Sequence, residues 1–431
     1  MKKVLWICNI MLPVIAKEAG LPFSNREGWL TGIFQALTAK EDREIALGIC
    51  FPVEKGSILL QKEGAALTVC GVPCYAFEED LQHPECYNSS MEAAFQKIYE
   101  DFRPDMIHIF GTEFPHALAA AKVFGKPEKT LLGIQGLCYE IAEVYMAGLP
   151  QKVCEAVSFR DFIRKDSLKQ QQQKFFQRGE REKEVIRLCG HITGRTAFDR
   201  KGTAKVNPGA KYHSMNETMR SSFYEGVWKK ENCEKHSIFL GQGDYPLKGF
   251  HFLLEAMPMI LERYPDAKVY VAGNSIIKNE TFKDKIKISA YGKYLLSLIR
   301  KYRLEDKVQS LGKLSEEEMK ERFLRSEVFV CASVLENSPN TIGEAMLLGV
   351  PVAASEAGGI PDMITHGKDG FLFKSGNPRE LANAVCTIFE DDAKKGVDVE
   401  TISCAARERA GKVHDGATNY QRLLEIYTVI I

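Results

Sequence analysis

The chain has 431 residues, 45% of them hydrophobic and 26% charged, so it is long enough for two or three globular domains with apolar cores. Its 57 Lys and Arg balance its 57 Asp and Glu, which excludes a global charge that would attract nucleic acid or an anionic membrane. The 12 scattered cysteines contain no C-x-x-C pair, so neither a zinc site nor a disulfide framework is indicated, and buried thiols in a reducing compartment are expected.

The first residues, MKKVLWICNIMLPVIA, place two lysines before an apolar stretch, as a signal peptide does. Asn9 and Pro13 interrupt that stretch and no A-x-A site follows, which favours a buried first β-strand instead. No run reaches the roughly 18 apolar residues that a membrane span needs. We expect a cytoplasmic protein, with peripheral contact at the inner face of the membrane left open.

The N-terminal half alternates short apolar runs with helical patterns. Strands are predicted at 2–8, 44–50, 66–77, 104–111 and 129–136, and helices at 28–39 and 90–102. Strands that alternate with helices indicate βαβ units and a parallel sheet.

Residues 159–187 interrupt this alternation. They carry nine Lys or Arg against five Asp or Glu, with phenylalanines and aliphatic residues between them. One interpretation is a long solvated helix with one packed face. The other is a segment that docks on a membrane surface or on an acceptor.

A second alternating block starts near Ser237. Strands are predicted at 237–243, 267–274, 308–312 and 328–333, and helices at 250–264, 288–303, 315–326 and 378–392. The predicted fold class is therefore α/β, with two Rossmann-like domains whose parallel sheets face each other across a cleft. We expect an N-terminal domain at 1–206, a linker at 207–236, a C-terminal domain at 237–413, and a helix at 414–431 that returns to the N-terminal domain.

The stretch VFVCASVLENSPNTIGEAMLLG carries the most specific chemical signal. It predicts a strand, a loop with Glu336, and a helix that begins near Pro339 or Asn340. The free N–H groups and dipole of a helix N-terminus favour a phosphate. Glu344, one turn into the helix, would repel phosphate but can accept hydrogen bonds from a ribose diol. Two carboxylates on either side of an anion site predict binding of a sugar nucleotide.

Two further loops fit this interpretation. Gly358 and Gly359 open a helix after the next strand, where glycine lets the backbone approach a ligand closely. Lys248 and Gly249 precede the helix at 250–264, and a lysine there suits a diphosphate. Each feature also has a plain structural explanation: a capping or surface glutamate, a tight turn, or a solvated lysine. Their order and spacing together favour the ligand site.

These residues resemble the retaining glycosyltransferases of family 4 (glycosyl transferases group 1), which have the GT-B fold. The resemblance is dense over about 237–375 and looser in the N-terminal half. It implies that the domain at 1–206 binds the acceptor and that the domain at 237–413 binds the nucleotide sugar. It implies that Glu336 contacts the donor sugar, that Glu344 contacts the ribose, and that Lys248 holds the diphosphate, so Glu336 and Lys248 are the catalytic candidates. The other donor-binding candidates that it implies are Gly28 of REGWLTG, Lys313 and Leu314 of GKL, and Asn340 and Thr341 at the helix start.

Two positions depart from the family pattern. Gln242 stands where many members have an arginine, so Lys248 is expected to carry more of the leaving-group stabilisation. Gln135, on the acceptor side, stands where many members have a histidine, so acid–base chemistry is not expected there. The stretches GRTAFDR, NPGAKY and NETMR resemble a bacterial surface-polysaccharide branch of the family.

The resemblance implies transfer of a glycosyl group from a nucleotide-diphosphate sugar to a saccharide or lipid-linked saccharide, with anomeric retention and no cofactor or metal. The absence of Asp-x-Asp from the sequence agrees with a metal-independent reaction. Two alternatives stay open: a nucleotide-sugar epimerase on the same fold, and a catalytically inactive sugar-nucleotide-binding protein. The sugar, the base and the acceptor are not specified by the sequence.

Overall fold

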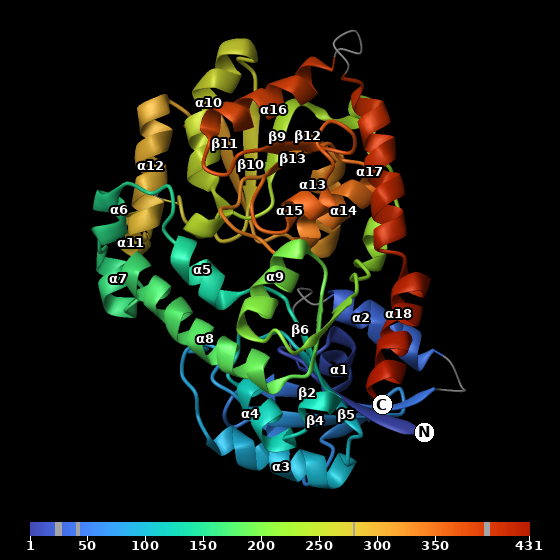
Figure 1. Cartoon of the computed structure of the whole chain (residues 1–431). Coiled ribbons are helices and arrows are strands. Elements are labelled where there is room, and N and C mark those ends of the chain that lie inside the picture. The colour runs from blue at the N-terminus through green and yellow to red at the C-terminus, as the bar shows by residue number, and fades with distance from the viewer. Residues whose placement is uncertain (22–27, 40–43, 279–280, 392–396) are drawn as a thin grey trace. The chain divides into compact units, whose positions relative to one another are not determined.

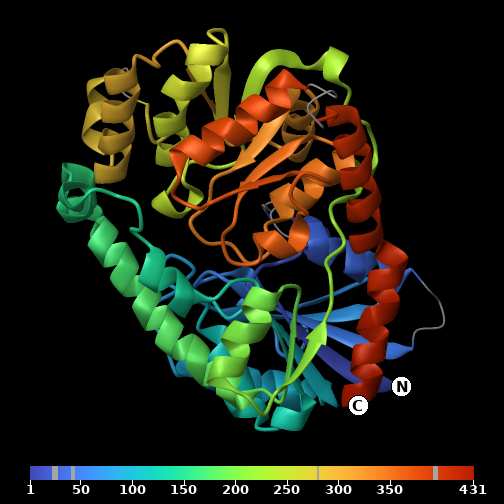
Figure 2. The ribbon, with the colours of Figure 1, turned by 45° about the horizontal axis from the view of Figure 1, so that its top comes forward.

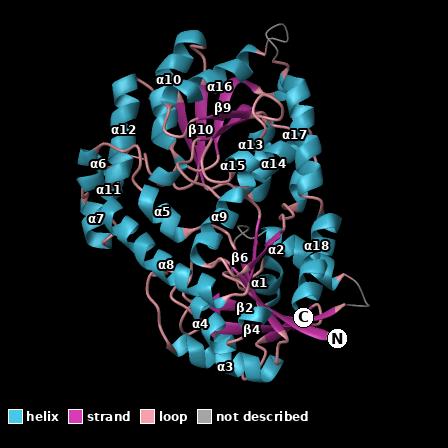
Figure 3. Ribbon diagram, viewed as in Figure 1, coloured by secondary structure: helices cyan, strands magenta, loops and turns pink. Residues whose placement is uncertain are grey.

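The computed structural model describes residues 1–21, 28–39, 44–278, 281–391 and 397–431. The chain divides into two units, each with strands inside and helices outside (Figures 1 and 3). Unit 1 consists of Met1–Ala142, Lys174–Arg220 and His414–Ile431, and unit 2 of Glu143–Gln173 and Ser221–Val413. Both are α/β units with predominantly parallel sheets, as the sequence predicts.

Unit 1 contains an eight-stranded sheet with the order β3-β4-β2-β1-β5-β6-β7-β8. Its neighbouring strands run parallel except for β3 and β4, which are antiparallel. The strands are β1 Lys2–Ile7, β2 Ile45–Val53, β3 Leu67–Val69, β4 Val72–Glu78, β5 Met106–Phe110, β6 Thr130–Gly133, β7 His191–Gly194 and β8 Lys211–Ser214. The stretch that resembled a signal peptide thus begins with a central strand, and Val4 to Ile7 are buried.

Helices cover both faces of this sheet (Figure 2). They are α1 Pro13–Glu18, α2 Gly28–Thr38, α3 Ser90–Phe102, α4 His116–Phe124, α5 Cys138–Val144, α8 Leu168–Leu188, α9 Ala197–Val206 and α18 Gly416–Ile430. One apolar cluster joins β1 and β2 to α1, α2 and α18, and the other joins β1 and β5 to α3, α4 and the end of α8. The C-terminal helix is therefore part of the core of unit 1.

Helix α8 is fastened to unit 1 by polar contacts. Arg178 Nε donates to the Glu113 carbonyl (3.0 Å), and Arg181 donates to the Glu85 carbonyl (3.1 Å). Glu182 is fully buried and accepts hydrogen bonds from the Thr112 hydroxyl and from the Tyr139 N–H. Arg178, Arg181 and Glu182 of this helix thus make their hydrogen bonds within the protein.

Unit 2 contains a six-stranded, wholly parallel sheet with the order β11-β10-β9-β12-β13-β14. The strands are β9 Glu234–Leu240, β10 Lys268–Ala272, β11 Val308–Gly312, β12 Ser326–Cys331, β13 Val352–Ser355 and β14 Phe371–Phe373. The first strand, β9, lies beside the fourth, β12. The strand order therefore reverses between β9 and β12, which is the position where doubly wound sheets bind ligands.

The helices of unit 2 pack in two groups (Figure 1). Helix α10 contacts α12 and α16, and helix α14 contacts α13 and α17. The bounds are α6 Gln151–Glu155, α7 Phe159–Arg164, α10 Phe250–Arg263, α11 Phe282–Lys287, α12 Ala290–Tyr302, α13 Glu316–Leu324, α14 Asn340–Leu348, α15 Ile360–Met363, α16 Pro378–Glu390 and α17 Val399–Val413.

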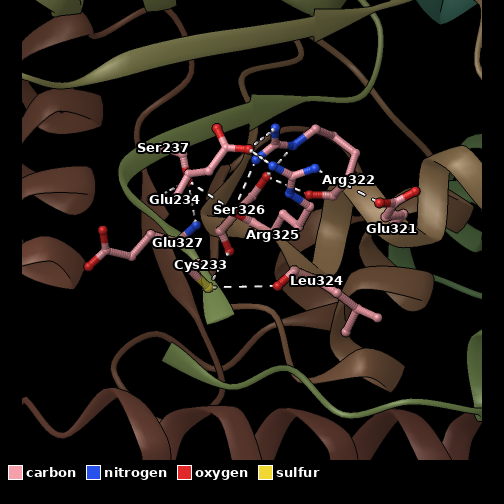
Figure 4. A network of polar contacts seen from close by, with 9 residues as sticks. All are labelled: Cys233, Glu234, Ser237, Glu321, Arg322, Leu324, Arg325, Ser326 and Glu327. Carbon is pink, nitrogen blue, oxygen red and sulfur yellow. Dashed lines mark hydrogen bonds and ion pairs between the residues drawn. The ribbon is translucent and has the colours of Figure 1, made fainter. Parts of the chain in front are cut away.

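A polar network ties the amino ends of β9 and β12 together (Figure 4). The guanidinium of Arg322 donates to Glu234 (3.1 Å) and to the Ser326 hydroxyl (3.1 Å), and it lies 4.0 Å from the centre of the Tyr270 ring. Arg325 pairs with the same Glu234 carboxylate at 2.8 Å. This network fixes the two central strands at the end opposite to the candidate site.

Several elements differ from their predicted form. Residues 159–187 are not one long helix: α7 and α8 are separate, because Lys165 takes a left-handed conformation (φ 50°) that ends α7. The predicted strand at 66–77 is a hairpin, β3 and β4, with left-handed Cys70 and Gly71 at its turn. The predicted linker contains β8, which adds to the edge of the first sheet. No helix in the described ranges is long and apolar enough to cross a membrane.

The unit boundaries also differ from the predicted domains. Residues 143–173 cluster with unit 2, although they precede the predicted boundary at 206. Asp161 explains part of this, because its carboxylate accepts a hydrogen bond from the Ala290 N–H at the start of α12 (2.8 Å). Residues 207–220 cluster with unit 1, through β8.

Candidate functional site

The candidate site in unit 2 is centred on an ion pair between two predicted catalytic residues. Lys248 Nζ donates to Glu336 Oε1 at 2.6 Å, and the Ser333 hydroxyl donates to the same oxygen at 2.8 Å. The Lys248 and Glu336 side chains are 21% and 16% exposed, so solvent or a ligand can reach both. Lys248 follows β9 and Glu336 follows β12, so the pair lies at the point where the strand order reverses.

The loops that carry these two side chains are locked together. The Val334 N–H donates to the Leu247 carbonyl at 2.7 Å. Gly249 has a φ of +68°, and a Cβ there would lie 1.9 Å from the Ala332 carbonyl oxygen. Only glycine permits this approach, which explains the Lys-Gly sequence at the start of α10.

The Gly358–Gly359 turn supports Glu336 from the other side. The Gly359 N–H donates to the Glu336 carbonyl at 2.9 Å. A Cβ on Gly358, whose φ is +57°, would lie 2.0 Å from that same carbonyl oxygen. These glycines, predicted to let the backbone approach a ligand, here allow close contact between two loops.

The Lys248 ammonium is held in its charged form. Burial alone would lower the pKa of Lys248, but the neighbouring Glu336 carboxylate raises it, and the net pKa lies above its ordinary value. Lys248 therefore stays protonated near neutral pH, and in the structure its charge is paired with the Glu336 carboxylate. Such a charge, placed beside a helix N-terminus, can stabilise a leaving diphosphate.

Helix α14 contributes the other residues of the double-glutamate stretch. It begins at Asn340, directly after Pro339, and Asn340 and Thr341 are half-buried in its first turn. Glu344 lies further along the helix and is only 3% exposed. The two carboxylates thus occupy different environments: Glu336 pairs with a lysine in the loop, and Glu344 is buried in the helix.

The remaining predicted donor residues lie at separate places. Gln242 is half-buried in the loop after β9, and Lys313 (exposed) and Leu314 (half-buried) follow β11, two strands away from β9 in the sheet. Gly28 belongs to unit 1, where it is the first residue of α2. Residues 22–27, which include part of the REGWLTG stretch, lie outside the described residues.

Gln135, the predicted acceptor-side residue, lines a pocket inside unit 1. The pocket is small, with an accessible volume of about 20 Å³, and it lies where β5, β6, β7 and β8 end. Gln135 Nε2 donates to Glu217 Oε1 at 3.1 Å, and Arg195 forms an ion pair with the same carboxylate. Glu217 Oε2 is buried without a hydrogen-bond partner among the described residues, so the pocket can accept a polar ligand group.

His108 adds a defined donor to this pocket. Trp6 Nε1 donates to the Tyr427 hydroxyl (2.7 Å), so the hydroxyl keeps its own proton for His108 Nδ1 (2.8 Å). Burial lowers the pKa of His108 to about 3, so the ring is neutral with its proton on Nε2. That Nε2 is buried and has no partner within the described ranges.

Sequence reasoning missed His108, Arg195 and Glu217 as site residues. Arg195 and Glu217 lie in GRTAFDR and NETMR, which the sequence marked only as features of a family branch. His108 lies inside an apolar strand, and nothing in the sequence indicates that Tyr427, more than 300 residues away, orients it. The described residues show no group of three or more His, Cys, Asp or Glu suited to a metal ion.

Comparison with known families is informative for unit 2. Residues 224–403 match the model of the family described as glycosyl transferases group 1. The matched segment covers less than half of the chain. It contains Lys248, Glu336 and Glu344, so the ion pair described above lies inside the matched segment.

Relatives and solved structures extend the likeness. The chain is 31% identical over 161 residues to the uncharacterized glycosyltransferase MJ1607 of Methanocaldococcus jannaschii (37% of each chain). It is 28% identical over 196 residues to spore coat protein SA of Bacillus subtilis (45% of this chain and 48% of that protein). These alignments span less than half the length of either relative.

HepE from Anabaena, solved in complex with UDP, superimposes with a TM-score of 0.64 at 16% identity, over 99% of this chain and 100% of that one. The chain therefore has the GT-B fold, and the segment that matches the family model lies in unit 2, one of its two Rossmann-like parts.

Proposed function

We propose that the protein is a retaining glycosyltransferase, of class EC 2.4, that moves a sugar from a nucleotide-diphosphate donor to an acceptor hydroxyl. The observation that carries the proposal is the Lys248–Glu336 ion pair, with 2.6 Å between the ammonium and the carboxylate, at the reversal of strand order in the segment that matches glycosyl transferases group 1. A cation, a carboxylate and a helix N-terminus provide what a departing diphosphate and a sugar need.

Each residue has a role in this proposal. Lys248 and the first turn of α14, with Asn340 and Thr341, neutralise the diphosphate. Glu336 contacts the donor sugar, and Glu344 accepts hydrogen bonds from the ribose. Because Lys248 and the helix N-terminus supply the positive potential, the reaction needs no metal ion.

Four further residues complete the proposed donor and acceptor sites. Gln242, in the loop after β9, hydrogen-bonds the diphosphate without adding charge. Lys313 and Leu314 read the base through their backbone, and Gly28 faces the phosphates. Gln135 lies on the acceptor side, in the pocket with Glu217 and Arg195.

The donor and the acceptor are proposed from chemistry and from relatives. UDP-sugars are the first donors to test, because the HepE structure is a complex with UDP. The acceptor is a saccharide or a lipid-linked saccharide in surface polysaccharide or glycoconjugate biosynthesis, in line with the resemblance of GRTAFDR and NETMR to that branch. Neither assignment affects the proposed role of Lys248 and Glu336.

Incubation with a UDP-sugar, with and without candidate acceptors, tests the activity. A glycosyltransferase releases more UDP when an acceptor is present, and the ¹H coupling of the product shows the same anomeric configuration as the donor. A nucleotide-sugar epimerase would convert the donor in the absence of an acceptor, and an inactive binding protein would bind the donor without turnover on any acceptor. Either of these two results would overturn the proposal.

A further inference from the structure

Helix α7, Phe159–Arg164, turns its apolar side chains outward. Phe159, Phe162 and Ile163 are 62%, 71% and 63% exposed, and they share one face because they stand three and four residues apart. Val157, just before the helix, is 59% exposed. These four side chains are called the α7 patch below. Among the described residues, Phe159 and Phe162 are the strongly exposed phenylalanines.

The polar face of α7 points inward and is firmly held. Asp161 is 2% exposed, and its carboxylate accepts hydrogen bonds from the Ser158 N–H (3.1 Å) and from the Ala290 N–H of α12 (2.8 Å). Arg160 pairs with Asp161 (2.9 Å) and with Asp166 (3.0 Å). A helix that faces water normally has the opposite orientation, with its apolar face inward. The α7 patch is therefore fixed in an outward position by contacts within unit 2.

Positive charge surrounds the patch. Arg164 and Lys165 end the helix and are exposed, as is Lys152 in α6. The nearby acids are engaged, because Glu155 lies 3.5 Å from Lys169 and Asp166 pairs with Arg160. Residues 151–169 contain five basic and three acidic side chains, a net charge of +2 in a chain whose overall charge is zero.

The size of the patch argues against a second protein chain as its occupant. Four side chains, each about 60% to 70% exposed, offer roughly 400 Å² when a large side chain buries about 150–250 Å². Stable protein interfaces bury about 800 Å² per partner. A lipid surface needs only a few inserted apolar groups with basic neighbours. We infer that the α7 patch inserts into the headgroup region of an anionic bilayer, with Arg164 and Lys165 against the lipid phosphates.

This inference places the membrane-binding segment at 157–165, in place of the longer segment 159–187 considered from the sequence. On α8, Lys174 pairs with Glu85 (3.1 Å), and Arg178 and Arg181 bond to backbone carbonyls of unit 1. These residues are used to hold α8, so they are not available to a membrane. The inference does not depend on the proposed transferase activity, and its test measures binding rather than turnover.

Vesicle flotation with the full chain tests the inference. Wild-type protein should float with phosphatidylglycerol–phosphatidylcholine vesicles at low salt, release at high salt, and bind pure phosphatidylcholine weakly. Arg164→Gln with Lys165→Asn should reduce the partition coefficient about 30-fold, since each basic residue contributes about 1 kcal/mol near an anionic surface. Asparagine is chosen for position 165 because it tolerates the left-handed backbone there.

A variant without the apolar side chains of the α7 patch, compared with a matched control, distinguishes insertion into the bilayer from electrostatic attraction to its surface. Phe159→Ser, Phe162→Ser and Ile163→Ser together should abolish binding and leave the melting temperature unchanged, because all three side chains are exposed. Lys55→Gln with Ile58→Ser makes similar changes at another exposed basic and apolar pair, in unit 1, and should float like the wild type. A Phe162→Trp variant should show a blue-shifted tryptophan emission, quenched by brominated lipid.

Three results would overturn the inference. The wild type could fail to float with anionic vesicles at low salt, or the triple serine variant could float as well as the wild type. The third is a wild type that does not float but forms dimers, together with a triple variant that is monomeric, because the α7 patch would then be an interface between two copies of the chain.

Discussion

Lys248 and Glu336 neutralise each other in the structure, so a diphosphate that enters the site competes with Glu336 for the same ammonium. Replacing Lys248 with alanine should cost about 2–4 kcal/mol of transition-state stabilisation, as removal of an electrostatic donor does, and lower kcat/KM by about 30- to 1,000-fold. Adding Gln242→Arg to that variant should restore part of the activity, because it returns a cation to the loop. Steady-state kinetics with the active donor checks both, and an active Lys248→Ala enzyme would mean that the phosphates bind elsewhere.

The two glutamates should respond differently to the same change. Glu336→Gln should lower kcat by two orders of magnitude or more, because Glu336 lies beside the reacting sugar in the proposed site. Glu344→Gln should mainly raise the donor KM, because its proposed partner is the ribose. Melting temperatures serve as the control for Glu344, which is 3% exposed. Equal and small effects from the two variants would contradict the assignment.

His108 gives unit 1 a pH-dependent stability. Its pKa is about 3 when folded, against an ordinary value near 6.5, so the unfolded chain takes up a proton that the folded chain does not. The stability from neutral His108 is fully present above pH 6.5 and is lost as the pH falls from 6.5 towards 3, by about 2 kcal/mol between pH 7 and pH 5.

Thermal unfolding of the wild type and of His108→Gln at both pH values tests this. The stability advantage of the wild type should shrink at pH 5, because glutamine does not titrate. If the difference in stability between the wild type and His108→Gln were the same at pH 7 and pH 5, it would contradict the claim that His108 is neutral in the folded protein.

At the same residue scale, the sequence predicted Lys248, Glu336 and Gln135 as site residues, but neither the ion pair between the first two nor the other side chains around Gln135. Lys248 and Glu336 lie in stretches with strong strand–loop–helix patterns, so their place at strand ends follows from local signals. His108, Arg195 and Glu217 meet only because β5, β7 and the segment after β8 lie in one sheet. Contacts of that range depend on the topology, which local patterns do not specify.

Among the elements, the turn into α10 is the one most constrained by its backbone. Gly249→Ala should misplace Lys248, because the added Cβ would lie 1.9 Å from the Ala332 carbonyl oxygen. Gly367→Ala is a matched control: its φ of +74° resembles the +68° of Gly249, but no atom lies within 4 Å of its Cβ. Both variants meet the left-handed penalty of about 1–2 kcal/mol.

Gly249→Ala should in addition lose most of its activity and melt at a lower temperature than Gly367→Ala. Calorimetry measures the melting temperatures of both variants, and steady-state kinetics measures their kcat/KM. If the two variants behave alike, the contact with Ala332 does not position the lysine.

Regular elements were predictable from the sequence where their apolar period was clear. The helix predicted at 250–264 matches α10 to within one residue, whereas β9 and β12 lie three and two residues before the strands predicted at 237–243 and 328–333. The break between α7 and α8 was not predictable, because it depends on the left-handed Lys165 and on the burial of Asp161 against α12. Without that contact the phenylalanines of 159–163 look like one packed face of a longer helix.

For the whole molecule, alternation of strands and helices sufficed for two Rossmann-like domains, and the family resemblance added the GT-B fold, whereas the division of the chain did not follow sequence order. Unit 1 takes in α18, through Tyr427 and its hydrogen bonds to Trp6 and His108. Unit 2 takes in 143–173, through Asp161 and α12. A single boundary in the sequence cannot describe these units, because each is built from segments that are not contiguous in the chain. The domain limits are therefore best tested by limited proteolysis of the full chain, not by truncation at 206.

A thermal-shift screen of nucleoside-diphosphate sugars tests the central claim, a diphosphate-sugar site at Lys248 and Glu336, most directly. Wild-type protein should be stabilised by at least one nucleotide sugar and by its nucleoside diphosphate, with a shift that grows with ligand concentration. Lys248→Ala should show little or no shift with the same ligands. If no nucleotide sugar stabilises the wild type, or if the variant is stabilised equally, the claim is contradicted.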